Sequence, residues 1–572
     1  MNDHLRHSCA HLLAAAVKQL WPGTHNAIGP AIENGFYQDF DFSDVKISEA
    51  DFEKIEKKMY EILKKWHKFE LKEVSVEQAR KDFADNPYKL ELIEEFAEQG
   101  KKITENNPGN FLDLCKGGHC ENPQKEMQHF KLLSVAGAYW RGSEKNKMLT
   151  RIYGTCFPTK KELDDYLTML DEAKKRDHKK IGRELELFLF EETAPGMVYW
   201  LPKGLTMYNI LYSYARSMYK KYGYQEVATP QLNKKELYET SGHWTHYKTD
   251  MFVSDMGKEE IFGIKPMNCP NAMRIFAYKT RSYNDLPLRL AETTVLHRFE
   301  LSGTLNGLFR TRQFRQDDAH IFVTGAQIKT EFESLMKMVE EMYRLFNLTY
   351  KLRFGTRPKN FLGESKDWDH AEEVLKIVLD ASKKEYFVAP GEGAFYGPKV
   401  DILMRDSLGR EWQTGTIQLD FQQPKRFNLL YIDSDGKQTT PITMHRAIYG
   451  SFERFFGILV EHFAGKFPVW LAPVQVVIVP IADRHTDAAK KIADQLQEAG
   501  IRVELDDRNE TMQAKIRDAT LQKVPYMGII GDRETESGNG KISVRTREGK
   551  DLGQMTVSQF LQKVKEEIDK KI

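Results

Sequence analysis

The fold of the central part of this 572-residue chain is best read from residues 296–322, "LHRFELSGTLNGLFRTRQFRQDDAHIF". Arg298 and Glu300 are separated by one residue, so in a strand their side chains would face the same side. A glycine-containing loop follows, and Arg310 lies beyond it. Arginine suits phosphates and carboxylates, and a carboxylate can accept from an exocyclic amine. The pattern favours a nucleotide site, with a surface ladder of ion pairs as the alternative.

A second arginine stands among aromatic residues in the segment "HRAIYGSFERFFGILVEHF", which begins at His445. Its periodicity predicts an amphipathic helix, and Arg454 on that helix could stack on a purine. The chain has no Walker or Rossmann glycine motif. The nucleotide site is therefore predicted to be of another kind.

Cys269 stands between two prolines in residues 264–272, "IKPMNCPNA". Together with His320 and His445 it has the residue types of a zinc site, although sequence separation alone cannot show that the three meet. A buried cysteine that acts as a small apolar residue, with two structural histidines, is the alternative.

Composition limits the class of protein. The 84 basic and 83 acidic residues give a net charge of +1, which excludes a histone-like polycation. The five cysteines are scattered without a CxxC pair, which favours a reducing compartment. No run approaches the roughly eighteen apolar residues of a membrane span. We expect a cytoplasmic protein of two to four domains that does not enter the membrane.

We predict four segments along the chain. Residues 1–158 are α+β, and residues 159–188 form a charged connecting helix with Thr159 and Glu162 as a capping box. Residues 189–470 carry the nucleotide chemistry. Residues 471–572 alternate strands and helices, which indicates a parallel or mixed sheet covered by helices. In this last segment "KISVRTR", which starts at Lys541, is predicted to be an edge strand, followed by a closing helix.

The first segment has a second group of possible metal ligands. His7 and His11 are four residues apart and so share one helical face, and Cys115 and His119 lie in "DLCKGGHC". As bare spacing the histidine pair is more often structural. Four such ligands in one domain also fit a zinc site, so both readings stay open at this point.

Several motifs, in order, resemble a known family. "TP" at Thr229, "HRFE" from His297 and "GSFER" from Gly450 look like the three motifs of class II aminoacyl-tRNA synthetases. With "KPMNCP", "RQDDAHIF", "GEGAFYGPK" and "IQLDF" they resemble the threonyl-tRNA synthetases in particular. The resemblance runs from about His7 to the C-terminus. Many bacterial members begin with a ubiquitin-like domain, which we do not find ahead of His7.

The resemblance implies a fold and an activity. It implies an N-terminal α+β editing domain, a class II catalytic core built on an antiparallel sheet, and a C-terminal α/β anticodon-binding domain. The enzyme would be a cytoplasmic homodimer that activates L-threonine with ATP, transfers it to threonine tRNA and hydrolyses mischarged seryl-tRNA.

The resemblance also implies roles for residues of the core. Arg298 would hold the α-phosphate and the substrate carboxylate, Glu300 the adenine, Arg310 a phosphate, and Arg454 the base and the γ-phosphate, with Mg²⁺ on the ATP. One zinc ion per subunit would be held by Cys269, His320 and His445. Five further residues would line the threonine and adenylate pocket: Gln316, Asp318, Tyr396, Lys399 and Gln418.

Physical chemistry explains why such an enzyme needs a metal and a second site. A hydrophobic pocket separates isosteres such as threonine and valine only about 100-fold. A metal ion that coordinates the substrate hydroxyl can reject valine, because valine has no hydroxyl. Serine keeps the hydroxyl and loses one methyl, which gives roughly 10- to 200-fold discrimination. A hydrolytic site is therefore expected, and the resemblance assigns it to His7, His11, Lys89, Cys115 and His119, without a metal; a second zinc is the alternative.

In the last segment the resemblance assigns anticodon reading to Asn509, Glu534 and Arg545, with four cations near the tRNA backbone: Arg508, Lys515, Arg517 and Lys523. Two rival functions remain: a synthetase for proline or serine, and a synthetase-like protein that only binds RNA. The cysteine and two histidines argue against the first. The presence of Arg298, Arg310 and Arg454 argues against the second.

Overall fold

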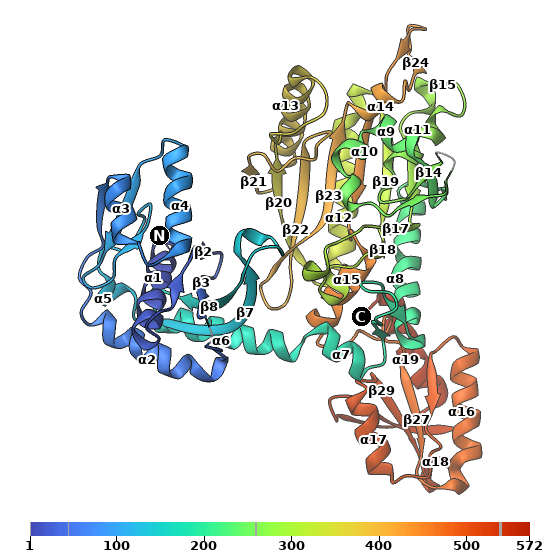
Figure 1. Cartoon of the computed structure of the whole chain (residues 1–572). Coiled ribbons are helices and arrows are strands. Elements are labelled where there is room, and N and C mark those ends of the chain that lie inside the picture. Colours follow the sequence, from blue (N-terminus) through green and yellow to red (C-terminus); the bar gives the residue numbers. More distant parts are fainter. Residues whose placement is uncertain (1, 44, 258–259, 537–539) are drawn as a thin grey trace. The chain divides into compact units, whose positions relative to one another are not determined.

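The computed structural model describes residues 2–43, 45–257, 260–536 and 540–572. The chain divides into two compact units, residues 1–171 (unit 1) and 172–572 (unit 2) (Figure 1). Each unit is described by itself. In the described part of the chain no helix is long and apolar enough to cross a membrane.

Unit 1 is built on a helix that lies against a sheet. The helix α1 (Asn2–Leu20) packs on β3 (Gly35–Asp41) and on α2 (Phe52–Leu63). The sheet runs β1 (His25–Asn26), β3, β8 (Met148–Cys156), β7 (Phe130–Tyr139), with β2 (Ala31–Ile32) also paired to β3. Leu5, Cys9, Leu12 and Leu13 recur at helical spacing and are buried. This apolar stripe fixes α1 on the sheet and leaves its histidines on another face.

Unit 1 also contains a second, three-stranded sheet with two helices beside it. It runs β4 (Glu70–Val74), β5 (Ile103–Asn107), β6 (Asp113–Leu114), beside the helices α3 (Val76–Asp82) and α4 (Pro87–Glu98). Asn86 caps α4, because its side-chain oxygen accepts from the backbone N–H groups of Tyr88 and Lys89. The cap places Lys89 in the first turn of α4, where its side chain is buried.

The connecting segment holds two helices, so the single predicted helix is wrong. These are α6 (Lys160–Lys175) and α7 (His178–Glu184). The predicted capping box is present: the N–H of Thr159 donates to Glu162, and the N–H of Glu162 donates back to the Thr159 hydroxyl. The break comes at Asp177, whose carboxylate accepts from the N–H of Lys179 at 2.7 Å and starts α7. An aspartate inside a charged helical pattern can thus act as a new cap.

The centre of unit 2 is an eight-stranded sheet. Its order is β11 (Gln225–Glu226), β16 (Leu288–Glu292), β19 (Asp318–Val323), β26 (Ile442–Ala447), β23 (Glu411–Asp420), β22 (Lys399–Arg405), β20 (Thr349–Gly355), β21 (Tyr386–Ala389). Only the edge pairs β11–β16 and β20–β21 are parallel; the other five pairings are antiparallel. This is the antiparallel-sheet core that the motifs predict.

One face of this sheet packs on helices and the other holds polar residues. In β19, Ala319, Ile321 and Val323 join a large apolar core. The helices of that core are α7, α8 (Pro202–Lys221), α12 (Ile328–Arg344), α13 (Ser365–Ser382) and α15 (Phe452–His462). Asp318 and His320 alternate with those residues and point to the opposite face. The period of two therefore places the polar residues of "QDDAHIF" together.

Shorter elements lie in the segments that connect the strands of the central sheet. They are β12 (Leu232–Lys234), α9 (Lys235–Ser241), α10 (His243–His246), β13 (Val253–Asp255), β14 (Ile261–Ile264), α11 (Cys269–Ala277), β15 (Arg281–Ser282), β17 (Val295–His297), β18 (Gln313–Arg315), α14 (Gln423–Arg426), β24 (Tyr431–Ile432) and β25 (Gln438–Thr439). The loop between β17 and β18 contains the short 3₁₀ turn η6 (Gly307–Phe309).

The C-terminal part of unit 2 is a five-stranded mixed sheet. Its order is β28 (Val503–Leu505), β27 (Val476–Pro480), β29 (Tyr526–Ile530), β30 (Lys541–Thr546), β31 (Asp551–Thr556), with parallel pairing in the first three strands. The helices α16 (Thr486–Glu498) and α17 (Met512–Leu521) cover opposite faces, and α19 (Val557–Lys570) lies on the same apolar cluster as α16 (Figure 1).

One strand of this domain differs from the prediction. The segment "KISVRTR" forms β30, which is paired on both sides, and the edge strand is β31. The sequence of β31, "DLGQMT", has a glycine with φ +77° and little apolar alternation. A turn in which the N–H of Gly549 donates to the carbonyl of Thr546 connects β31 to β30.

Candidate active site

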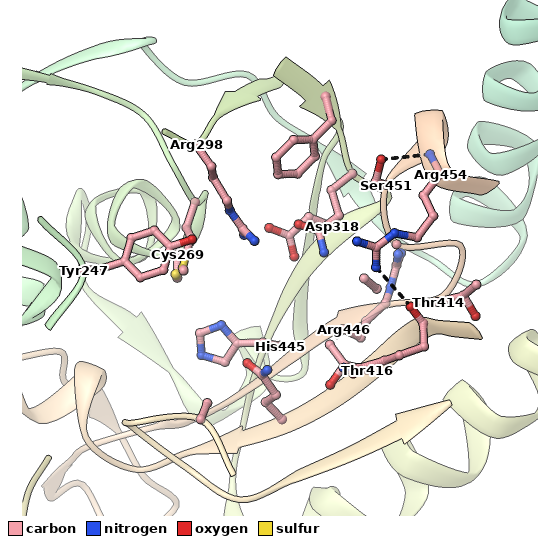
Figure 2. Close-up of a pocket in the computed structure, with 18 of the residues that line it drawn as sticks. Tyr247, Cys269, Arg298, Asp318, Thr414, Thr416, His445, Arg446, Ser451 and Arg454 are labelled. Atoms are coloured by element: carbon pink, nitrogen blue, oxygen red, sulfur yellow. Dashed lines mark hydrogen bonds between the residues drawn. The ribbon is translucent and has the colours of Figure 1, made fainter. Parts of the chain in front are cut away.

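The polar face of the central sheet of unit 2 forms the wall of a cavity of about 390 Å³. Figure 2 shows Arg298, Asp318, His445 and Arg454 around this common space. Eleven of the predicted core residues line it: Cys269, Arg298, Glu300, Arg310, Gln316, Asp318, His320, Tyr396, Gln418, His445 and Arg454. Lys399 is the predicted residue that does not. It stands opposite Gln418 in the β22–β23 ladder, and its ammonium lies 3.1 Å from Asp401.

Cys269, His320 and His445 meet in this cavity. One potential ligand atom from each lies within 4.8 Å of the others. His320 and His445 are direct partners on the neighbouring strands β19 and β26, with ring centroids 4.7 Å apart. Cys269 is the first residue of α11. A sheet and a helix start therefore bring together three residues that are far apart in sequence.

The carboxylate of Asp420 orients one of these ligands. Its Oδ2 lies 2.9 Å from Nε2 of His445, and its Oδ1 accepts the backbone N–H groups of Gln422 and Gln423. A ring nitrogen fixed by a carboxylate leaves the other nitrogen to face a metal, an arrangement common in zinc sites. Sequence reasoning did not find Asp420, although it stands in the quoted segment "IQLDF".

Burial controls the charge of the triad. Burial, followed by the carboxylates of Asp318 and Asp420, holds the pKa of the Cys269 thiol well above its usual value. Burial likewise holds the pKa of His320 well below its usual value. Both effects oppose isolated charge in this cavity, so a thiolate at Cys269 requires a nearby cation.

A fourth histidine lies beside the triad. His243 is fully buried, with its Nε2 3.2 Å from Sδ of Met267 and 3.9 Å from Sγ of Cys269. Burial, and then the charge of His445, lower the pKa of His243 to about 3. It is therefore neutral. Nothing in the residues around position 243 marked it as part of this site.

Arg298 has no carboxylate within ion-pair distance among the described residues. Its Nε donates to the carbonyl of Pro266 at 3.3 Å, and its guanidinium lies over the rings of Phe314 and Tyr247 at 5.1 and 5.8 Å. Aromatic faces and one carbonyl hold this side chain in place without neutralising its charge. It can therefore meet an anionic ligand.

Glu300 and Arg310 form an ion pair at the rim of the cavity. The Oε2 of Glu300 accepts from Nε and from a terminal nitrogen of Arg310, each at 2.7 Å. Arg310 is half exposed, with 49% of its side chain accessible. Arg298 and Glu300 both follow β17, which ends at His297. These two residues are therefore not in a strand, and their predicted strand placement is wrong, although both line the cavity.

Arg454 lies in the first turn of α15. Ser451 caps this helix by accepting from the N–H of Arg454 at 3.1 Å. The side chain of Arg454 donates to the carbonyl of Phe309 at 2.9 Å and to that of Gln413 at 3.3 Å. Burial, and then the charges of Arg298 and Arg310, lower the pKa of Arg454. Three arginines that face one space form a site for a polyanion.

The four predicted ligands of unit 1 also meet. His7, His11, Cys115 and His119 place one ligand atom each within 4.8 Å of the others. The Sγ of Cys115 lies 3.1 Å from Nε2 of His119 and 3.7 Å from Nε2 of His7. The rings of His7 and His119 stack at 4.6 Å. His7, His11, Lys89 and Cys115 line a cavity of about 350 Å³.

A buried carboxylate that sequence reasoning missed organises this cluster. The two oxygens of Asp113 lie 2.6 Å from Nζ of Lys89 and 3.1 Å from Nδ1 of His11. Although burial raises the pKa of Asp113, Lys89 and His11 hold it well below its usual value. Asp113 stands two residues before Cys115 in "DLCKGGHC", which was the available signal.

The cluster contains an internal ion pair between a histidine and the thiol. Burial lowers the pKa of His11, but hydrogen bonds to Asp113 and Cys115 raise it to about 9. Burial raises the pKa of Cys115, but hydrogen bonds from His11, His119 and His7 lower it to about 3. Near neutral pH the group is therefore an imidazolium beside a thiolate. Burial lowers the pKa of His119.

The predicted anticodon residues are spread over the C-terminal sheet. Asn509 is exposed in the loop before α17, and Arg545 lies on β30. Glu534 already accepts from Ser543 at 2.7 Å and from Gln554 at 3.0 Å. Their roles in reading bases stay predictions.

The cations predicted near the tRNA backbone have other surroundings. Lys515 is buried and 3.4 Å from the carbonyl of Pro480, so its placement at the surface is wrong. Lys523 donates to the carbonyl of Ala464 at 2.9 Å, and Arg508 is paired with two aspartates. Arg517 is 73% exposed.

Comparison with known families gives the class. The model of the "tRNA synthetase class II core domain (G, H, P, S and T)" matches residues 247–463, and that of an "Anticodon binding domain" matches residues 475–567. The model of the "Threonyl and Alanyl tRNA synthetase second additional domain" matches residues 106–153, which include Cys115 and His119. The fold and the cavity are those of a class II aminoacyl-tRNA synthetase with an editing-type domain.

Full-length relatives give the family. The chain is 49% identical over 575 residues to a threonine–tRNA ligase of Thermotoga neapolitana, covering all of this chain and 89% of the relative. It is 50% identical over 564 residues to that of Caldanaerobacter subterraneus, covering 98% and 87%. The chain belongs to the threonine–tRNA ligase family.

Solved structures agree with this assignment. The RNA binding domain of threonyl-tRNA synthetase from Cryptosporidium parvum superposes with a TM-score of 0.66 at 40% identity, covering 68% of this chain and 98% of that chain. Prolyl-tRNA synthetase of Giardia lamblia, at 20% identity and a TM-score of 0.55, covers 71% of this chain and 79% of that chain and shares the fold.

Proposed function

We propose that this chain activates L-threonine with ATP, transfers it to threonine tRNA, and hydrolyses mischarged seryl-tRNA in unit 1. The observation that carries the proposal is one cavity whose walls hold both a Cys/His triad and three arginines. A polyanion site beside a metal-ligand set suits ATP and an amino acid that bind next to each other. Membership of the threonine–tRNA ligase family supports this pairing.

The arginines would neutralise the phosphates. The carboxylate of threonine attacks the α-phosphorus, and the bond from this phosphorus to pyrophosphate breaks. Mg²⁺ on the ATP would add positive charge near the phosphates. Such a step needs positioning and charge neutralisation rather than a covalent intermediate on the protein. Arg298, held by a carbonyl and two rings, would contact the α-phosphate and the attacking carboxylate. Arg310 and Arg454 would contact the other phosphates from two sides of the cavity.

The carboxylate of Glu300 would recognise adenine. One of its oxygens accepts from Arg310. The other can accept from the exocyclic amine of the base. Gln316, Asp318, Tyr396 and Gln418 would surround threonine. The Tyr396 hydroxyl donates to Gln418, which fixes both side chains. Lys399 would contribute from the neighbouring ladder position, one strand away from the lining residues.

Cys269, His320 and His445 fit a zinc ion, because they offer one sulfur and two imidazoles within 4.8 Å, with His445 oriented by Asp420. The neighbouring carboxylates, Asp318 and Asp420, add negative charge that favours a dication. When bound, zinc supplies a Lewis-acid partner for the amine and hydroxyl of threonine, and valine cannot offer the hydroxyl.

The cluster of unit 1 would hydrolyse the seryl ester. Water attacks the ester carbonyl carbon, and the bond from this carbon to the ribose oxygen of the tRNA breaks. The ribose oxygen is the leaving group and takes up the proton that the water gave to the base, so free serine and the tRNA hydroxyl are the products. His119, whose lowered pKa keeps it neutral, would take the proton of this water. Lys89 and His7 would face the developing negative charge. The thiolate of Cys115 already has an internal cation in His11, so this site is proposed to work without a metal.

The C-terminal domain would read the anticodon through Asn509, Glu534 and Arg545. We further propose a cytoplasmic homodimer, in line with family membership. We expect Arg545→Ala to weaken charging of threonine tRNA and to leave adenylate formation intact. Equal loss of both activities would contradict this division of labour.

Amino-acid-dependent exchange of pyrophosphate into ATP tests the proposal. Wild type should exchange with threonine, more weakly with serine, and hardly at all with valine or proline. Cys269→Ser should lose threonine exchange together with bound zinc. Absence of threonine exchange in wild type, with tRNA binding retained, would favour the RNA-binding alternative. Undiminished exchange in Cys269→Ser would remove the triad from the mechanism.

A further inference from the structure

A histidine of the connecting segment touches the catalytic loop. His178, the first residue of α7, is buried and uses both ring nitrogens. Its Nδ1 lies 2.8 Å from Oε1 of Glu461 on α15. Its Nε2 lies 3.0 Å from the backbone nitrogen of Leu308, in the turn η6 between Glu300 and Arg310. His178 therefore joins α7, α15 and the loop that carries Arg310.

The partners fix the state of this ring. The N–H of Leu308 can only donate, so Nε2 of His178 presents its lone pair. The carboxylate of Glu461, ion-paired with Arg410 at 2.6 Å, accepts, so Nδ1 carries the proton. Only the neutral Nδ1–H tautomer satisfies both contacts. A protonated ring would lose the bond to the loop.

These contacts also explain a third group of possible metal ligands. Asp177, His178 and Glu461 offer ligand atoms within 4.8 Å of one another. However, the lone pair of His178 accepts from Leu308, and Asp177 caps α7. The group is therefore a hydrogen-bonded junction and not a metal site.

Two glycines allow the turn to lie close to its supports. A Cβ at Gly307, where φ is +50°, would lie 2.3 Å from Nε2 of His178. A Cβ at Gly457 on α15 would lie 3.0 Å from the ring of Phe309 and 3.1 Å from Cβ of Leu308. Any side chain at either position would push the turn away from α7 or α15. The turn is thus held between two helices with no spare space.

In this position the turn Gly307–Phe309 supports Arg454, one of the three arginines of the cavity. The carbonyl of Phe309 accepts from Nε of Arg454 at 2.9 Å. The ring of Phe309 also packs on that of His178, with centroids 4.1 Å apart. A displaced turn would move this carbonyl, and Arg454 would lose the nearer of its two backbone acceptors and keep the carbonyl of Gln413 at 3.3 Å.

We propose that His178 is a positioning residue for ATP: it anchors the turn Gly307–Phe309, and through the Phe309 carbonyl it sets Arg454 against the phosphates. The proposal rests on the role proposed above for Arg454. His178 itself touches neither substrate. Its effect should therefore fall on ATP and not on threonine, whose proposed contacts lie at the Cys/His end of the cavity.

Two substitutions separate the two bonds of His178. In His178→Asn the amide nitrogen can replace Nδ1 and keep the bond to Glu461, but the side chain is too short to accept from Leu308. His178→Gln can bring its amide oxygen to the position of Nε2 and restore that acceptor. Loss of one buried hydrogen bond should raise KM for ATP on the order of 10-fold in His178→Asn. His178→Gln should recover most of this change.

Pyrophosphate exchange with ATP and threonine varied separately measures the split. KM for threonine should stay within about twofold of wild type, because the Cys/His end of the cavity is untouched. Unchanged KM for ATP in His178→Asn would overturn the proposal. So would an equal rise of both KM values, which would indicate a general structural defect.

The same contact can be broken from the loop. Gly307→Ala places a Cβ against His178 and should reproduce the ATP defect of His178→Asn. Gly303→Ala is the control within the same loop, because a Cβ there meets nothing within 4 Å. Gly436→Ala controls for positive φ, since Gly436 has φ +78° in open space. ATP binding unchanged in Gly307→Ala, or equally impaired in both controls, would contradict the proposal.

A double-mutant cycle separates this inference from the function on which it rests. ATP binding is measured by calorimetry, so that no turnover is needed. Arg454→Ala should weaken ATP binding, and adding His178→Asn should weaken it no further, because the anchor acts through Arg454. If Arg454→Ala binds ATP normally, the role of Arg454 fails. If His178→Asn has the same effect in both backgrounds, only the inference about His178 fails.

Discussion

Two clusters of cysteine and histidine in this chain use the same ligand atoms but differ in charge. In the core, burial and the carboxylates of Asp318 and Asp420 hold the pKa of Cys269 well above its usual value. In unit 1, the thiolate of Cys115 is offset by the imidazolium of His11. We infer that the core cluster needs an added cation such as a metal ion to ionise its thiol, whereas the cluster of unit 1 already contains a cation in His11. Ligand spacing alone cannot show this difference; the surrounding charges can.

The largest expected effect breaks the cluster of unit 1. Cys115→Ala removes the thiolate that balances His11 and bonds His119, and hydrolysis of seryl-tRNA should fall by about 100-fold or more. Threonine-dependent pyrophosphate exchange should stay at the wild-type rate. Deacylation of preformed seryl-tRNA measures the first quantity. Loss of both activities would show that the two clusters are not independent.

The next effect tests the core cluster through its supporting carboxylate. In Asp420→Asn the amide oxygen can still accept from the backbone, which turns the amide nitrogen toward the N–H of His445. Zinc affinity should fall roughly 10- to 100-fold, as measured by competition with a chelator. Asp435→Asn, at an exposed turn, is the control. Unchanged zinc affinity in Asp420→Asn would mean that His445 needs no orientation.

A smaller effect concerns the reactivity of Cys115. With a pKa of about 3 against the usual 9, it is a thiolate at pH 5, where an ordinary thiol is about 10⁻⁴ ionised. A less basic thiolate is a weaker nucleophile, and this offsets most of the gain in ionised fraction. At pH 5 the alkylation rate of Cys115 should therefore be roughly 10-fold higher than that of an ordinary thiol. Alkylation by iodoacetamide, followed by mass spectrometry, should show a rate for Cys115 that is flat from pH 5 to 8. A rate that rises about tenfold per pH unit would contradict the ion pair.

The smallest expected effect concerns how the free energy of unfolding depends on pH. The raised pKa of His11, from 6.5 to about 9, gives stability that is present below 6.5 and lost as pH rises through 9. The lowered pKa of Cys115, from 9 to about 3, gives stability that is present above 9 and lost as pH falls through 3. Between pH 6.5 and 9 the two slopes cancel, because folding only moves a proton from sulfur to nitrogen.

In Cys115→Ser the pH dependence of the free energy of unfolding that comes from His11 should become visible. The stability of this variant should fall as pH rises above 6.5, by at most about 1.4 kcal/mol per pH unit, because Asp113 still raises the pKa of His11. The fall should end below pH 9, because the contribution of Cys115 to the pKa of His11 is lost. Wild type should be flat over the same range. Thermal unfolding of the first unit, followed across this range in both proteins, gives the comparison. Parallel curves for the two proteins would show that the thiolate and imidazolium are not coupled.

The motif resemblance predicted the antiparallel core, which the structure confirms, and it named residues that line one cavity of this core; their chemical roles stay predictions. The alternation in "QDDAHIF" sends Asp318 and His320 to the polar face and Ile321 to the core. The motif resemblance brought in Cys269. Neither pattern depends on where distant segments meet, so both could be read without a structure.

Other parts could not be predicted, because they depend on tertiary contacts. Asp113 and Asp420 stand in quoted segments, but each acts by reaching a histidine on another element, His11 and His445. His243 lies beside Cys269 only after α10 and α11 pack. His178 stands in the segment predicted to be a charged connecting helix, and its role comes from Leu308, 130 residues away.

Zinc content of the full chain tests the central claim most directly. Metal analysis should find about one zinc per chain in wild type and in Cys115→Ala, and almost none in Cys269→Ser. That result would show that charge environment, and not ligand type, decides which cluster binds metal. Two zinc ions in wild type, with one lost in Cys115→Ala, would contradict it.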